Sequence, residues 1–121
     1  EKAEEKYPEV EKKPEITIDD FDKVQIQVGE VIKCEPVPKA KKLLVSQIKI
    51  GAETRQIVSG IAKYYKPEEM VGKKVAVITN LKPCKLCGVE SQGMILAAGD
   101  DEGNLSVVTV DKDIVSGSEI C

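Results

Sequence analysis

An alternating run near the start of the chain, interrupted by a glycine, is the feature that most constrains the fold. Val24–Val28 alternates apolar and polar residues, the pattern of a strand with one buried face. Gly29 breaks the alternation and Val31 resumes it, so we expect one long strand with a bulge or a sharp bend. Pro36 and Pro38 are expected to end that strand, since proline cannot donate to a ladder.

The remaining elements follow in an order typical of a small barrel. Two strands should form a hairpin, a short helical connection should follow, and later strands should complete the sheet. The expected strands are Leu43–Ile50, Thr54–Ser59, Val75–Thr79, Met94–Ala98 and Leu105–Val110. The expected turns and loops are a helical turn from Asp19 as N-cap, helical turns over Ile61–Met70, and a polar loop over Asn80–Gln92. This order predicts an all-β OB-fold, a closed five-stranded barrel with a helical connection after strand three; a β-sandwich is the alternative.

Charge is distributed unevenly along the 121 residues, which are one domain's worth of chain. Residues 1–22 hold four Lys and nine acids, a net charge of −5. Residues 23–96 hold thirteen Lys or Arg and six acids, a net charge of +7. Residues 97–121 hold one Lys and six acids, again −5. A basic body between acidic ends favours a polyanionic partner such as nucleic acid, although such charges can also merely solvate a surface.

Composition argues against several classes of protein. The chain has no His, and no acid pair, nucleophile–base pair or phosphate loop stands out, so we expect neither catalysis nor a cofactor. There is no Trp and aromatics are 3%, which argues against a face of stacking rings. No apolar run approaches the ~18 residues of a membrane span, so no membrane contact is expected.

Four cysteines occur, two of them as a Cys84–Cys87 CxxC. Metal binding would need two more ligands, and a redox pair normally opens a helix after a strand. Neither context is evident here, so small packing residues in a loop are the favoured interpretation, with metal and redox roles as alternatives. Unpaired thiols and the absence of a signal peptide fit the cytoplasm.

Several motifs, in order, resemble the tRNA-binding domain family. The segment Phe21–Gly29 resembles the family's opening motif. The match continues through Lys42–Leu44, Arg55–Ile61, Tyr65–Glu68, Gly72–Val75, Asn80–Pro83 and Gly88–Ala97. The nearest resemblance is to the domain appended to the C-terminus of bacterial methionyl-tRNA synthetases. Residues 1–18 then resemble an acidic linker, and 19–121 the tRNA-binding domain with an extension from about residue 100.

The resemblance implies a domain that binds tRNA by shape at the outside corner of the L, raises the tRNA affinity of the ligase in cis and dimerises through its extension. It also implies an accessory role rather than catalysis. Motif positions and loop lysines give the expected RNA-binding residues: Lys42, Arg55, Asn80, Lys82, Lys85, Ser91, Gln92 and Met94. Apolar residues beyond a five-stranded barrel give the expected homodimer interface: Leu105, Val107, Val108, Val110, Ile114, Val115 and Ile120.

Other interpretations of these residues stay open. Met94 begins an apolar strand and can equally pack in the core, and Ser91 can be a turn residue that bonds its own backbone. Of the pair Tyr64 and Tyr65, one ring is expected in the core and one at the rim. A free-standing tRNA-binding protein and a peptide-binding export chaperone share the same family fold, so both remain alternatives.

Overall fold

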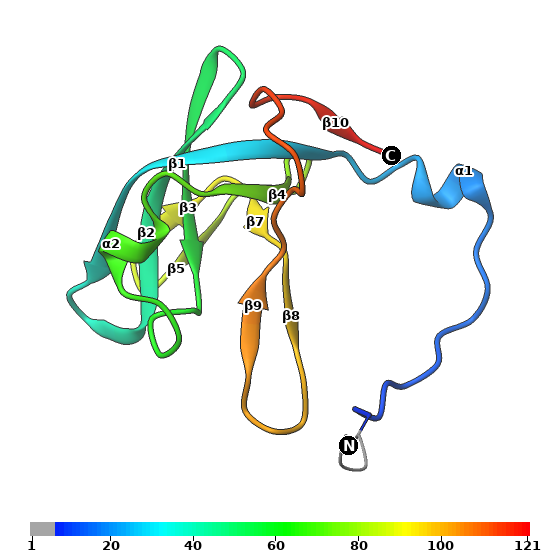
Figure 1. Ribbon diagram of the computed structural model, residues 1–121, viewed down its shortest axis with the longest axis horizontal. Coiled ribbons are helices and arrows are strands. Elements are labelled where there is room, and N and C mark those ends of the chain that lie inside the picture. The colour runs from blue at the N-terminus through cyan, green and yellow to red at the C-terminus, as the bar shows by residue number, and fades with distance from the viewer. Residues whose placement is uncertain (1–6) are drawn as a thin grey trace.

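The computed structural model describes residues 7–121 and confirms an all-β chain (Figure 1). Two short helices are present in this part: α1 (Ile18–Phe21) and α2 (Pro67–Met70). The longer strands are β1 (Ile26–Val37), β2 (Ala40–Ile50), β3 (Glu53–Ser59) and β4 (Lys74–Ile78). The shorter strands are β5 (Cys84–Leu86), β6 (Val89–Ser91), β7 (Met94–Ile95), β8 (Ala97–Gly99), β9 (Leu105–Val107) and β10 (Glu119–Ile120).

The main sheet has six strands and β1 at its centre, in the order β3-β2-β1-β4-β7 with β10 added to β1. The first half of β1 pairs with both β4 and β10, and its second half pairs with β2, all antiparallel. One long strand therefore serves two layers of the fold, which is why it has to bend (Figure 1).

The pairing of β1 with β2 is irregular at two points, and neither of them is Gly29. The register with β2 shifts between Val31 and Lys33, so the bulge is at this point and not at Gly29 as the sequence suggested. Gly29 instead allows close packing, because a Cβ there would lie 2.5 Å from Cγ2 of Ile48. The strand also continues through Pro36, where a second register shift accommodates the proline.

The two helices are set by local hydrogen bonds. Thr17, and not Asp19, is the N-cap of α1: its hydroxyl accepts from the Asp20 amide at 3.3 Å and its amide donates to the Asp20 carboxylate. α2 follows β3 as predicted, and Met70 at its end is fully buried against the core. The helical connection thus anchors the crossover from β3 to β4.

Aliphatic side chains from β1 to β4, β7 and β9 form one core. The fully buried members include Val31, Leu44, Ile48, Ile57, Met70, Val75 and Val77. Val107 also belongs to this core and is 5% exposed, so its assignment to a dimer interface is wrong for this residue. Leu105 packs against the same cluster.

Backbone pairing leaves the main sheet open, which corrects the prediction of a closed barrel. The hydrogen-bonded path ends at β3 on one side and at the two-residue β7 on the other. The expected fifth strand is interrupted after Ile95, and its second part, β8, pairs only with β9 within residues 7–121. The expected loop over 80–92 instead contains the β5–β6 hairpin.

The C-terminal segment returns to the main sheet. Thr109 forms a bridge with Val75, and β10 adds to β1 with Ile120 opposite Ile26. Among the remaining residues expected at a dimer interface, three are exposed and two are half-buried. The exposed ones are Val108 (41%), Ile114 (45%) and Val115 (72%), and the half-buried ones are Val110 and Ile120.

The described part of the lead-in, residues 7–17, is exposed and carries no helix or strand (Figure 1). Its amide at Glu9 donates to the Asp101 carboxylate in the β8–β9 turn, with a nitrogen–oxygen distance of 3.0 Å. Residues 1–6 of the expected linker lie outside the described residues.

Candidate nucleic-acid interface

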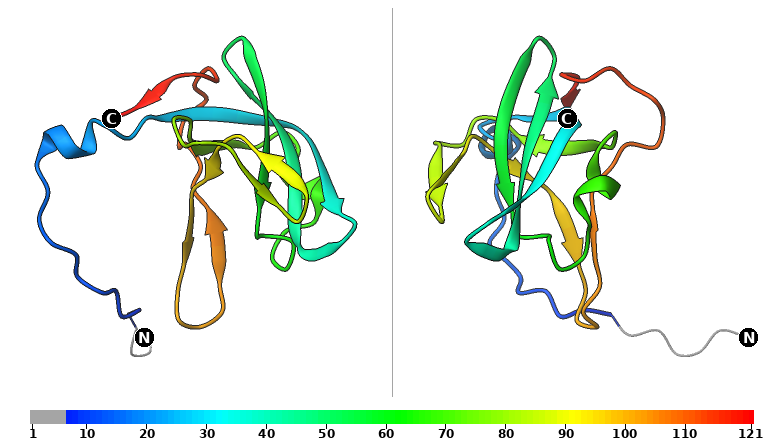
Figure 2. Two further views of the ribbon diagram at one scale, coloured as in Figure 1. Left: turned by 180° about the vertical axis from the view of Figure 1, so that it is seen from behind. Right: turned by 90° about the vertical axis from the view of Figure 1, so that its left-hand side faces the viewer.

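The β5–β6 hairpin projects from the side of the main sheet (Figure 2) and carries two of the expected RNA contacts. Cys87 and Gly88 form its two-residue turn, with φ of 51° and 81°. Lys85 lies on β5 opposite Glu90, and Lys82 precedes the hairpin; both lysines are exposed. Within the described chain, neither ammonium forms a hydrogen bond or ion pair. Both are therefore free for an anionic ligand.

The turn between β1 and β2 lies beside the tip of this hairpin. A groove of about 440 Å³ is lined by Lys39 of that turn, by Ala40–Leu43 at the start of β2 and by Cys87 of the hairpin. Lys42 was expected at the site, whereas the sequence reasoning missed Lys39 and Lys41. The run Lys39-Ala40-Lys41-Lys42 between two strands was the available signal. The structure thus brings two lysine-bearing segments that are distant in sequence beside one another.

Other expected contacts are engaged within the protein. The side chain of Asn80 accepts from the Gln25 amide at 2.9 Å and donates to the Lys23 carbonyl at 2.7 Å. Arg55 donates from Nη1 to the Thr79 and Gln92 carbonyls and pairs with Glu53 through Nε at 3.0 Å. These groups hold segments of this chain together.

Ser91 and Gln92 are engaged in the same way. Ser91 is 3% exposed, and its hydroxyl accepts from the Val58 amide at 2.9 Å and donates to the Gly93 carbonyl at 3.0 Å. The side chain of Gln92 accepts from the Gln56 amide at 3.0 Å. The Ser91 hydroxyl is therefore not accessible to RNA in this structure.

Met94 and the tyrosines occupy different settings. Met94 is 44% exposed and lines an apolar groove with Leu86. Tyr65 packs against the core, accepts at its hydroxyl from the Val107 amide and has the Lys73 ammonium 5.9 Å from its ring centre. Tyr64 is 39% exposed, so one ring is in the core and the other at the rim, as expected.

The cysteine pair is exposed, so the expectation that Cys84 and Cys87 are packing residues is wrong. Strand geometry separates their Cα atoms by roughly 9–10 Å, beyond the ~7 Å that a disulfide tolerates. No cluster of metal-ligating side chains occurs among residues 7–121. Cys34 differs from this pair: it is buried, and desolvation raises the pKa of its thiol.

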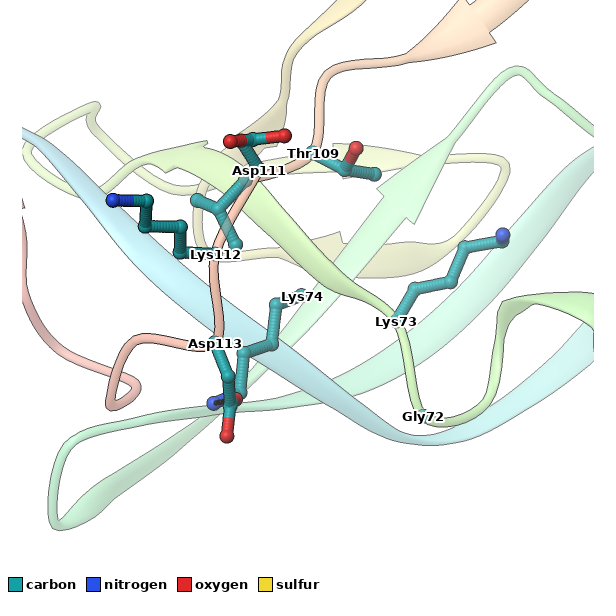
Figure 3. A pocket seen from close by; sticks show the side chains of 8 residues that line it. Gly72, Lys73, Lys74, Thr109, Asp111, Lys112 and Asp113 are labelled. Atoms are coloured by element: carbon teal, nitrogen blue, oxygen red, sulfur yellow. Dashed lines mark hydrogen bonds and ion pairs between the residues drawn. The ribbon is translucent and has the colours of Figure 1, made fainter.

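A second pocket, between Gly72–Lys74 and Thr109–Asp113, gathers charges of both signs (Figure 3). The Lys74 ammonium contacts a carboxylate oxygen of Asp113 at 2.6 Å, and this hydrogen bond lowers the pKa of that carboxyl. Lys73 and Lys112 point away from each other (Figure 3). These lysines do not converge on one point where an anion could bind. The exposed lysines at 39–42, 82 and 85 therefore remain the better candidate for an anion-binding surface.

The fold defines the class of protein: a small β-domain with exposed lysines beside one projecting hairpin. The chain belongs to the tRNA-binding domain family, since the family model described as "Putative tRNA binding domain" matches residues 26–119. No helix in residues 7–121 is long and apolar enough to span a membrane.

Methionine–tRNA ligases contain closely similar segments. The Methanocaldococcus jannaschii ligase is 61% identical over 110 residues, 91% of this chain and 17% of the ligase. The Bacillus subtilis ligase is 55% identical over 120 residues, 99% of this chain and 18% of the ligase. The chain therefore spans less than a fifth of the length of these relatives.

Solved structures share the fold. A "MetRS related protein" from Pyrococcus horikoshii superposes with a TM-score of 0.85 at 38% identity, over 90% of this chain and 100% of that one. The chaperone CsaA from Bacillus anthracis has a TM-score of 0.81 over 89% of this chain and 100% of that one. Its 21% identity makes it a likeness of fold alone.

Proposed function

We propose that this domain binds tRNA electrostatically through the lysine turns, the name we give to Lys39 of the β1–β2 turn, Lys41 and Lys42 at the start of β2, and Lys82 and Lys85. The last two belong to the β5–β6 arm, which is the β5–β6 hairpin with its flanking residues, 80–92. The observation that carries this proposal is that these lysines are exposed on two segments that share a groove, and their ammonium groups have no partner within the described chain. Lysines supply the point charges that phosphates require.

Recognition is proposed to follow the shape of the RNA. A-form RNA displays phosphates and 2′-hydroxyls, while its major groove is too deep and narrow for side chains to read the base edges there. The lysine turns offer charge but few rings, since the chain has 3% aromatics. Competition between unrelated tRNAs and a single-stranded RNA tests this; a thousandfold preference for one tRNA would contradict it.

A salt titration with matched lysine variants tests the binding surface. Lys82→Ala/Lys85→Ala should weaken tRNA binding and reduce the slope of log K against log salt by about 1.4–1.8, because two lysine–phosphate ion pairs no longer form. Lys112→Ala is the control, because that exposed lysine lies in the acidic C-terminal segment. If both variants bind tRNA like the unaltered domain, the lysine turns are not the interface.

In a methionine–tRNA ligase the domain would act as an appended anchor. Holding tRNA near a separate active site raises its effective concentration, so deleting the domain should raise KM for tRNA. The kcat should hardly change, because uniform binding does not assist the chemical step. Aminoacylation kinetics with and without the domain test this. A tenfold loss of kcat at saturating tRNA with KM unmoved would refute the anchor mechanism.

Two alternatives keep specific support. The Pyrococcus horikoshii protein is matched over its whole length, so a free-standing domain of this kind is feasible. The mass of the endogenous protein decides between a free-standing domain and one appended to a ligase.

Peptide binding is favoured by the apolar groove of about 430 Å³ beside Leu86 and Met94. Displacement of bound tRNA by unfolded peptides that also bind the isolated domain would support this second function.

A further inference from the structure

Side chains help to fix both ends of the β5–β6 arm, which shares no strand ladder with the main sheet. At its start, the Asn80 amide substitutes for a strand neighbour and bonds the Gln25 amide and the Lys23 carbonyl ahead of β1. These two bonds, 2.9 Å and 2.7 Å long, reproduce the donor and acceptor of one ladder step. The segment that carries Lys82 therefore leaves the main sheet from a fixed point.

At its end, the arm is joined to β3 through a set of bonds that we call the β3 seam, between Arg55–Val58 and Glu90–Gln92. The Gln92 amide donates to the Gln56 carbonyl at 2.7 Å, and the Gln92 side chain accepts from the Gln56 amide at 3.0 Å. The Gln56 side chain donates to the Glu90 carbonyl at 2.8 Å, and the buried Ser91 hydroxyl accepts from the Val58 amide.

From these contacts we infer that Asn80, Ser91 and Gln92 are positioning residues, which hold the β5–β6 arm so that its lysines face the ligand together with the β1–β2 turn. This inference rests on the proposed function. An isolated two-stranded hairpin is marginally stable in water. The arm's strands form ladders only with each other among residues 7–121, so these side chains and the backbone bond from the Gln92 amide to the Gln56 carbonyl supply its attachment.

Fixing the arm before binding affects affinity because ordering a flexible segment in the complex costs free energy. A loosened arm would keep both its lysines yet bind RNA less tightly. The three polar residues thus influence binding through the arm, and their own contact with RNA is not required. Their positions in the family motifs predicted direct contact with RNA, and their polar side chains are compatible with such contact.

Two substitutions of Gln92 separate positioning from contact. Gln92→Met keeps the length of the side chain but removes the acceptor for the Gln56 amide. Gln92→Glu keeps that acceptor and adds a negative charge. Positioning predicts that Gln92→Met weakens tRNA binding roughly three- to tenfold and that Gln92→Glu binds better than Gln92→Met. Direct contact predicts the reverse order, because a carboxylate replaces an amide donor near phosphate.

Hydrogen exchange of the arm gives a readout that is independent of RNA. Amides of Cys84–Ser91 should exchange faster in Gln92→Met than in the unaltered domain or in Gln92→Glu. Gln92→Met should also weaken binding little further when it is added to Lys82→Ala/Lys85→Ala, because both changes act through the arm. Unchanged exchange in Gln92→Met, or binding weakest in Gln92→Glu, overturns the inference.

The lysine variant distinguishes failure of this inference from failure of the proposed function. If Lys82→Ala/Lys85→Ala binds tRNA normally, the proposed interface fails. If that variant binds tRNA weakly while Gln92→Met binds like the unaltered domain, the interface stands and the positioning role alone is refuted. Urea unfolding of each variant checks that the main sheet stays folded.

Discussion

Gly29 sits where three apolar side chains converge on β1. A Cβ at this position would lie 2.5 Å from Ile48, 3.1 Å from Val77 and 3.3 Å from Ile50 side-chain carbons. Contacts of this length need a shift of the neighbours, which are themselves held in a close-packed core. The absence of a side chain therefore lets β2 and β4 approach β1 from both sides.

Gly29→Ala should lower the free energy of unfolding by about 1–3 kcal/mol, because the added methyl overpacks the core. Gly60→Ala is the matched control, since its Cβ would lie 3.9 Å from its nearest neighbour, Leu43, in ordinary contact. Urea unfolding at constant pH measures both. Equal free energies of unfolding for the two variants would contradict this prediction, because the core around Gly29 would then accommodate a methyl group without cost.

At the scale of residues, the exposure of lysines was easier to predict from sequence than the hydrogen-bond partners of side-chain amides and hydroxyls. A Lys in a polar turn is nearly always exposed, so Lys42, Lys82 and Lys85 could be placed from sequence. Asn80 and Ser91 can bond either a ligand or the backbone, and the choice depends on what the fold brings within reach. Sequence alone carries no information on the Gln25 and Val58 amides that they meet.

The β5–β6 hairpin shows why short elements escape sequence analysis. Each strand has three residues, too few to establish alternation, and proline and glycine flank them. The turn uses Cys87 at positive φ, where asparagine or glycine would have given a recognisable signal. Of the longer elements, β3 was predicted to within one residue, because seven or more residues reveal the period. The end of β2 was also predicted, but the strand begins at Ala40 and not at Leu43.

Gly88→Ala should weaken the hairpin without disturbing its surroundings. Gly88 has a φ of +81° and no atom within 4 Å of a built Cβ, so the cost is backbone strain of about 1 kcal/mol. We expect faster hydrogen exchange in the hairpin and weaker tRNA binding, with little change in global stability. Cys87→Asn is the control, because asparagine tolerates positive φ. Identical exchange in both variants would contradict this prediction.

At the scale of the whole molecule, apolar residues of the C-terminal segment remain exposed. Val108, Ile114 and Val115 are 41%, 45% and 72% exposed, and Val24 ahead of β1 is 42% exposed. We propose that a second copy of this chain covers them, in an isologous contact through the segment from Leu105 to Cys121 and the start of β1. Val107 takes no part, since it lies in the core.

Sedimentation at micromolar concentration should therefore give about twice the chain mass of 13.2 kDa. Val115→Asp should shift the domain toward monomer, because a charge would be buried in the contact. Val10→Asp, on the exposed lead-in, should leave the mass unchanged. A monomer for the unaltered domain at this concentration would refute the proposal.

The topology of the whole sheet was predictable only in part. The bent first strand, the hairpin and the helical connection follow from local pattern, and they fix most of the main sheet. Closure depends on pairs distant in sequence, here β3 with the residues before β7, and these are made by side chains and one backbone bond rather than by a ladder. No local period encodes such contacts, so the closed barrel was an extrapolation from element order.

The lead-in joins the body through α1, which lies at the opposite end of the longest axis from the β1–β2 turn (Figure 1). Residues 7–17 form no helix or strand, and eleven such residues can reach at most ~36–40 Å when fully extended. A body tethered by this segment would carry its cationic end outward, away from the point of attachment. The length of the tether then sets the volume that the cationic end can reach. Shortening residues 7–17 would therefore reduce the distance over which RNA is captured, while the intrinsic affinity of the lysines stays the same.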